Sequence, residues 1–250
     1  MMKMTDAYKI TTSRTYRIVT NIICGIVGAM LAFVLVAILN AGEEFGGIEF
    51  DENTSVTVKM LLVMYLFAGV LAVIMVFSDY FVFAGTADKN KGTMNYLRSS
   101  YNGKELIKKG VIGDFVYNAV RSFLAVPFIG IVTTSIIIGR CELGVVFGAI
   151  SVWAAMLISI TASNIIIRRY AKTLLNMVAF TYLSGGIYVL AIGLLGLVAS
   201  CVYEFGFNQI LMVVIAVVLL AVAMMFFTLG KRDMIKCYES GFIDKVGGDM

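Results

Sequence analysis

Long apolar segments alternate with short polar segments along the whole chain, and this alternation is its dominant pattern. Six apolar segments are long enough to cross about 30 Å of hydrocarbon as helices that rise about 1.5 Å per residue. They cover residues 16–39, 60–83, 115–138, 145–167, 174–202 and 210–229. The pattern predicts an all-α membrane protein with six transmembrane helices, in which residues 1–250 form a single transmembrane domain.

The polar segments divide into two groups by charge. All but three of the 20 Lys and Arg residues fall in the N-terminal tail, the second and fourth loops and the C-terminal tail. The exceptions are Lys59, Arg140 and Arg121, and the first loop carries an acidic run at residues 43–52. Because loops rich in Lys and Arg stay in the cytoplasm, we expect a multi-pass protein with both termini cytoplasmic.

The amino-acid composition excludes several classes of catalytic and binding site. Only 14% of the residues are charged, whereas soluble domains have roughly 25%. The chain has no His, which excludes imidazole metal sites and Ser–His catalysis, and it has no G-x-x-x-x-G-K-[ST] phosphate loop. We therefore expect no enzyme activity, metal or nucleotide on this chain, and no nucleic acid partner. The cysteine spacing matches no zinc or redox motif, and pairing of Cys141 with Cys201 stays open.

Within the spans, a few charged and small residues are candidates for special roles. Asp79 and Arg121 lie near the cytoplasmic ends of the second and third spans, where they could form a structural ion pair or take part in function. Small residues recur four apart, which permits close helix contacts. They are Gly25 with Ala29 and Gly28 with Ala32 in the first span, and Ser151, Ala155, Ser159 and Ser163 in the fourth. Such seams form within one molecule or between copies.

The longest polar loop separates the second and third spans and reads "TADKNKGTMNYLRSSYNGKELIKKGVIGD" over residues 86–114. Thr86 or Asp88 can cap a short helix, and Asn102-Gly103 is a turn signal. A second amphipathic piece, residues 104–111, then leads into the third span. A basic helix lying on anionic lipid would explain the lysines. It would not explain the two-part layout, which favours a protein-binding element.

This loop resembles the cytoplasmic loop of ABC-2 type permeases, the membrane subunits of one class of ATP-driven exporters. Asp88 stands where that family usually has Glu, and Gly92, Thr93 and Leu97 match. Lys109-Gly110 resembles the closing pair in reversed order, and Ser99-Ser100-Tyr101 stands where the family often has proline. The overall layout is also similar, with an amphipathic N-terminal helix expected within residues 5–17, six spans and inside termini.

The resemblance implies a permease of the bacterial plasma membrane that dimerises and docks a separate ABC ATPase subunit, which would hold the ATP and Mg. The loop would be the coupling helix, with docking residues Asp88, Gly92, Thr93, Tyr96, Leu97 and Arg98. A second copy, membrane lipid and amphipathic or antimicrobial peptide cargo are the other expected partners. Candidate residues for the dimer contact or translocation path are Gly28, Ala32, Tyr65, Phe67, Tyr182 and Gly186.

Three alternatives remain open beside peptide export. The same machinery could export lipid, drug or ion. The chain could instead be a non-transporting membrane sensor or scaffold whose inner loop recruits another partner. An intramembrane enzyme is the third alternative, and the missing catalytic residue types disfavour it.

Overall fold

The computed structural model of the protein describes residues 3–12, 14–41, 44–45, 48–49, 56–78, 99–141, 143–170 and 209–246. The elements in chain order are α1 (Met4–Thr11), α2 (Arg14–Ala41), β1 (Glu44–Phe45), β2 (Ile48–Glu49), α3 (Val56–Ser78), α6 (Gly103–Phe123), the π-helical turn η2 (Leu124–Phe128), α7 (Ile129–Ile138), α8 (Leu143–Tyr170) and α10 (Gln209–Val246).

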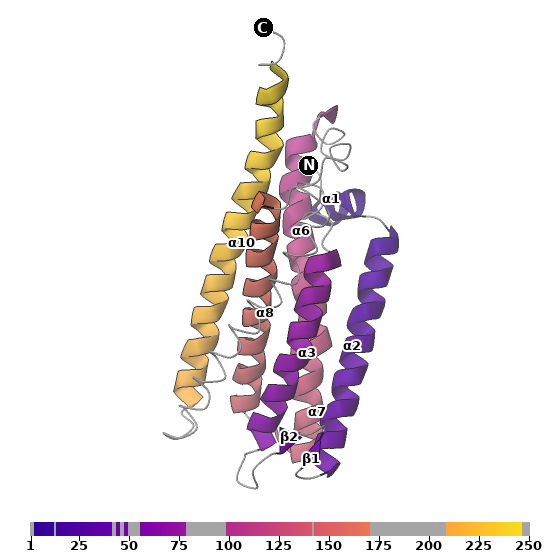
Figure 1. The fold of residues 1–250 in the computed structure, drawn as a ribbon, viewed down its shortest axis with the longest axis vertical. Helices are drawn as coiled ribbons and strands as arrows, with labels where there is room; N and C mark the ends of the chain where they lie inside the picture. The colour runs from indigo at the N-terminus through magenta and orange to yellow at the C-terminus, as the bar shows by residue number, and fades with distance from the viewer. Residues whose placement is uncertain are drawn as a thin grey trace.

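The long helices run side by side, and the short helix α1 lies across one end of the bundle (Figure 1). Among the described residues, five helical stretches are long and apolar enough to cross a membrane. They are Arg17–Ile38, Lys59–Val76, Gly103–Ile138, Leu143–Ile166 and Val213–Lys236. The chain is therefore a multi-pass helical membrane protein, and five of the six predicted spans are confirmed as helices over their described residues, the second as far as Ser78. The predicted span at residues 174–202 lies outside the described residues.

The two ends of the bundle differ. We call the end that holds α1, the start of α6 and the C-terminal part of α10 the basic end, and the opposite end, with the β1–β2 hairpin, the hairpin end (Figure 1). The hairpin pairs Glu44 with Glu49 and Phe45 with Ile48 in antiparallel register. α8 ends at the basic end and α10 begins at the hairpin end (Figure 1).

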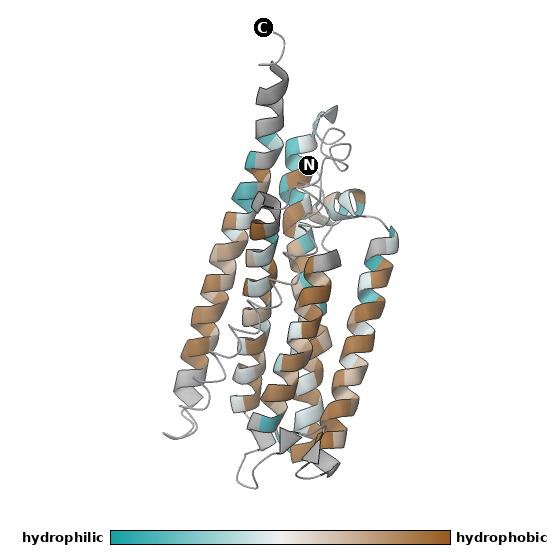
Figure 2. Ribbon diagram, viewed as in Figure 1, coloured by the Kyte–Doolittle hydropathy of each residue, from teal (hydrophilic) through white to brown (hydrophobic). Residues whose placement is uncertain are grey.

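Two helices extend beyond the predicted spans at the basic end. α6 begins at Gly103, so the amphipathic piece at residues 104–111 and the third span form one helix, and α10 continues past residue 229 to Val246. The extensions are held by a small apolar cluster, made of Ala7, Leu106, Ile107, Met234 and Tyr238. Where the extensions are coloured in Figure 2, they carry hydrophilic residues, and the residues along the rest of α10 are mostly hydrophobic.

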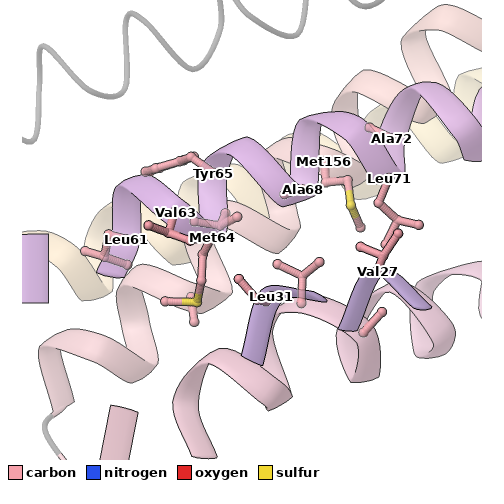
Figure 3. Packing of buried hydrophobic residues seen from close by; sticks show 14 of the residues in the cluster. Val27, Leu31, Leu61, Val63, Met64, Tyr65, Ala68, Leu71, Ala72 and Met156 are labelled. Carbon is pink, nitrogen blue, oxygen red and sulfur yellow. The ribbon is translucent and has the colours of Figure 1, made fainter. Parts of the chain in front are cut away.

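The main apolar core lies between α2, α3, α8 and the η2 turn. Val27 and Leu31 of α2 point toward α3, whose Met64 and Leu71 lie opposite, and Met156 comes from α8 (Figure 3). Large apolar side chains also cover the outside of the bundle, and Phe33 is 74% exposed. Apolar exposure on this scale is expected only where lipid replaces water as the solvent.

The third crossing is a single helix with one irregular turn in its middle. Pro127, the only proline of the chain, lies in the π-helical turn η2 between α6 and α7. Proline has no backbone N–H and its ring collides with the preceding turn, so a widened turn accommodates it without ending the helix. α7 ends at Ile138, and the next residue, Gly139, has a φ of 75°, the left-handed conformation that favours glycine.

Candidate functional site

Several residues singled out from the sequence lie outside the described residues. These are the docking residues Asp88, Gly92, Thr93, Tyr96, Leu97 and Arg98, the path residues Tyr182 and Gly186, and Asp79 of the expected ion pair. The coupling helix and the ion pair therefore stay predictions. The turn predicted at Asn102-Gly103 lies in the described part, and α6 begins at its second residue, Gly103. Cys141 is an exposed free thiol.

The described residues of the expected path are Gly28, Ala32, Tyr65 and Phe67, and most of their contacts are within the protomer. A Cβ atom at Gly28 would lie 3.1 Å from the backbone oxygen of Ala125, so α2 contacts the η2 turn there. Ala32 and Phe67 are half-buried, and Tyr65 is buried in the main core. Gly28 thus belongs to a seam within the molecule, whereas Gly25 on the same helix has open space beside it.

The small-residue stripe of α8 is also internal. Ser151, Ala155, Ser159 and Ser163 are each at most 4% exposed. α8 lies against α3 on one side and α10 on the other, and a Cβ atom at Gly148 would collide with Leu61 of α3. The stripe therefore lets helices of one protomer approach closely, which is one of the two roles that its spacing predicted.

Arg121 of α6 lies beside two stacked tyrosines. The rings of Tyr8 from α1 and Tyr117 from α6 stack with their centroids 4.4 Å apart. The guanidinium carbon of Arg121 is 5.9 Å from the Tyr8 ring centroid and 5.8 Å from that of Tyr117, and Arg17 of α2 lies 6.0 Å from the Tyr8 ring. Cations at such distances are attracted to the ring by roughly 0.5–1 kcal/mol at exposed sites and about 2 kcal/mol when desolvated.

Tyr8 is the residue through which α1 reaches the bundle. Its side chain is 2% exposed, and a Cβ atom at Gly113 would lie 2.9 Å from the Cβ of Tyr8, so a glycine in α6 makes room for it. Burial raises the pKa of Tyr8, and the nearby charge of Arg121 opposes that rise in pKa. The hydroxyl therefore stays protonated at neutral pH and can donate a hydrogen bond.

These residues line a pocket at the junction of α1, α2 and α6, which we call the basic pocket. Its volume is about 300 Å³, at the lower limit for small-molecule sites. It is lined by Tyr8, Lys9, Arg14, Arg17, Ile18, Asn21, Tyr117 and Arg121. Arg17 also donates a hydrogen bond from Nη1 to the backbone oxygen of Lys9, at 3.3 Å, which joins α1 to α2. The basic pocket is the candidate functional site of the described chain.

A row of buried polar residues continues along α6 from this pocket. Asn118 donates a hydrogen bond from Nδ2 to Oδ2 of Asp114 at 3.2 Å, and both side chains are buried. On the face toward α8, Trp153 donates from Nε1 to the backbone oxygen of Ala119 and to the Ser122 hydroxyl, each at 3.1 Å. Polar groups buried in a membrane helix need such partners, so this row fixes the rotation of α6 against its neighbours.

Outside the pocket, an exposed ion pair joins the helical extensions at the basic end. Lys104 of α6 lies 2.6 Å from the carboxylate of Glu239 in α10. The Lys104 ammonium donates a hydrogen bond to that carboxylate and holds the pKa of Glu239 below its usual range. Exposed pairs contribute little free energy, so the apolar contacts of Leu106 and Met234 hold the extensions together.

Sequence reasoning used Arg14 and Arg17 only to assign orientation and did not predict the pocket. The signal was present: Arg14, Arg17 and Asn21 share one face of α2 at i, i+3 and i+7, and Tyr117 and Arg121 are i, i+4 in α6. The spacing of these residues does not reveal that α1 packs against both α2 and α6 at these faces. Comparison of the chain with protein-family models, curated proteins and solved structures finds no significant match.

Proposed function

We propose that this chain is the membrane subunit of an ATP-driven exporter of the ABC-2 type, in a bacterial plasma membrane with both termini in the cytoplasm. The observation that carries the proposal is the segment at residues 88–98, in which Asp88, Gly92, Thr93 and Leu97 follow the order of that family's coupling helix. The helices that flank the segment support the proposal, because α3 ends and α6 begins toward the basic end of the bundle (Figure 1).

The contacts of α6 suit a role in transmitting movement. α6 starts directly after the proposed docking loop, and its first turns are packed against α1 and α10 through Leu106 and Ile107. The helix then continues through the η2 turn into α7 without a break. A displacement of the docking loop by an ATPase would therefore move α6 and α7 together. The widened turn at Pro127 is the point at which this continuous helix would bend.

A second copy of the chain would complete the transport path, as the resemblance implies. The proposed cargo is an amphipathic or antimicrobial peptide, with lipid, drug or ion as alternatives for the same machinery. Gly28 already contacts the η2 turn of its own protomer. We therefore place the α2 part of the dimer contact at Gly25 and Ala29, which are exposed on the same helix. ATP and Mg would be bound by the partner ATPase.

Coexpression with an ATPase tests the proposal. The Gly92→Trp variant, expressed with the proposed ABC ATPase partner, should lose the ATPase during affinity purification, because an indole blocks close approach at the docking loop. Leu143→Trp is the matched control, since Leu143 is 57% exposed at the hairpin end. Neutralising Lys89, Lys91 or Arg98 singly should weaken binding by only about 0–1 kcal/mol, as for exposed charges.

Two outcomes would contradict the proposal. A Gly92→Trp variant that retains the ATPase in full amount, with unchanged ATP hydrolysis, would remove the docking role of this loop. Stable purification of the wild-type chain with a partner other than an ATPase would favour a sensor or scaffold instead. Monodisperse elution of the variant in detergent shows that its transmembrane domain is still folded.

A further inference from the structure

The basic pocket concentrates positive charge in one place. Four of its eight lining residues are cationic: Lys9, Arg14, Arg17 and Arg121. None of the described lining residues is acidic, and the one carboxylate whose charge acts on Tyr8, that of the buried Asp114 on α6, offsets only part of the positive charge of four cations. Like charges repel one another when they are held together, so this arrangement favours a bound anion.

The pocket also contains hydrogen-bond donors that the described protein leaves unused. The Tyr8 hydroxyl and the Nη1 atom of Arg121 are buried, and neither makes a hydrogen bond of good geometry, although Arg121 and Thr12 lie close enough to the hydroxyl to lower the pKa of Tyr8. The Tyr8 side chain is 2% exposed and lines the pocket, so its hydroxyl cannot be satisfied by bulk water. Buried donors are nearly always paired in native structures, and a small movement of these two side chains toward an anion in the pocket would pair both.

The depth of the pocket matches the boundary of the membrane. The candidate span in α2 begins at Arg17. About 20 residues cross the hydrocarbon, so counting back from Ile138 at the end of α7 puts the other boundary near residue 119, close to Arg121. The two arginines thus lie at headgroup level. Ile18 lines the pocket and is 47% exposed. Ile22 lies one turn deeper and is 55% exposed, so both side chains lie where acyl chains can contact them.

We infer that the basic pocket binds an anionic phosphate group, carried by a phospholipid headgroup of the leaflet at the basic end or by a soluble phosphate compound. A phosphate accepts hydrogen bonds from several directions and matches the planar fork of arginine. The first turn of α2, with Arg14 and Arg17, adds unpaired backbone N–H groups and the positive end of the helix dipole. The occupied site would tie α1 to α2 and α6, whatever the chain transports.

The test is a binding titration on the purified full-length protein in a neutral detergent. Thermal unfolding is followed while dioctanoyl phosphatidylglycerol, dioctanoyl phosphatidylcholine or inorganic phosphate is added. We expect saturable stabilisation by phosphatidylglycerol and none by phosphatidylcholine. In the Arg17→Gln/Arg121→Gln variant, the apparent Kd for phosphatidylglycerol should rise at least about tenfold, because charge-assisted hydrogen bonds are lost.

A charge-matched control separates the site from the general positive field. Lys231→Gln/Arg232→Gln removes the same charge from α10 at the basic end, and neither residue lines the pocket. This control should bind phosphatidylglycerol as the wild type does. If Arg121→Gln prevents folding, Lys9→Gln/Arg14→Gln replaces it, since both side chains are exposed.

The outcomes assign the source of the phosphate or overturn the inference. Binding of phosphatidylglycerol without binding of inorganic phosphate identifies the headgroup as the source. Saturable binding of inorganic phosphate, lost in the same pocket variant, identifies a soluble phosphate compound. No saturable binding of either probe, or equal weakening in the pocket variant and the α10 control, would overturn the inference.

Discussion

The missing side chain at Gly28 lets α2 lie directly against the η2 turn. A Cβ atom there would collide with the end of the Ile129 side chain and would lie 3.1 Å from the backbone oxygen of Ala125. Ile129 can move, but the Ala125 oxygen belongs to a helix backbone and cannot move freely. One turn away, Gly25 has open space beside it. Two glycines three residues apart in one helix therefore have different roles, and the difference comes from the neighbouring helix.

The difference between Gly25 and Gly28 gives a prediction at the scale of the residue. Gly28→Val should destabilise the protein by about 1–3 kcal/mol, the usual cost of overpacking, while Gly25→Val should leave its stability nearly unchanged. Thermal unfolding of both variants in the same detergent measures the difference. Equal stability of the two would show that α2 does not contact η2 as described.

The sequence predicted that the first span has tight contacts but could not say which residues make them. Gly25 with Ala29 and Gly28 with Ala32 have the same i, i+4 spacing and the same side-chain sizes. Only the position of a partner helix distinguishes them, and that position depends on contacts far away in the chain. For the same reason the basic pocket, whose lining comes from three helices, could not be predicted from any one of them.

At the scale of the element, α1 is a helix of eight residues that depends on its contacts. Helices shorter than about 12 residues are marginal in water, so tertiary packing must supply the stability of α1. Ala7 and Tyr8 are buried against α6 and α10, whereas Lys9 and Ile10 are exposed. The amphipathic pattern at residues 5–17 predicted a helix here. It did not predict that the helix ends at Thr11 and that α2 begins at Arg14.

Removing the Tyr8 ring should detach α1 from the bundle. Tyr8→Ala loses a buried aromatic side chain, which costs about 3–5 kcal/mol in a well-packed site, and exposes the groove over Gly113. In a background without the native cysteines, a Cys at the buried position Thr11 should then react with a maleimide much faster. Ile10→Ala, at a position that is 57% exposed, is the control. Equal labelling rates in both variants would contradict docking through Tyr8.

The extensions of α6 and α10 show why span prediction gave the membrane-crossing parts but not the helix ends. Hydropathy reports where a helix can leave lipid, and it correctly placed the apolar parts of both helices. It does not report whether the helix continues in water. The continuation depends on Leu106, Ile107 and Met234 covering one another, a contact between segments more than a hundred residues apart.

At the scale of the whole molecule, the described bundle has apolar side chains both inside and outside. Large exposed apolar side chains occur on α2, α3, α6, α7 and α10, as lipid contact requires. α2 combines exposed small residues with exposed large ones, because Gly25 and Ala29 lie among Ile22, Ile26 and Met30. A surface of that kind allows close approach of a second helix, whereas a face of large residues alone keeps backbones apart.

The proposed homodimer therefore predicts contact between the exposed faces of two α2 helices. In a cysteine-free background, Ala29→Cys should form a crosslinked dimer in native membranes under mild oxidation, since Ala29 is exposed and small. Val218→Cys on α10 is the matched control, because Val218 is also exposed, at 53%, but lies on a helix outside the proposed contact. We expect crosslinking at position 29 and little at position 218. Crosslinking at position 218 without position 29 would move the contact to α10, and monomers from both variants would count against a dimer built on either helix.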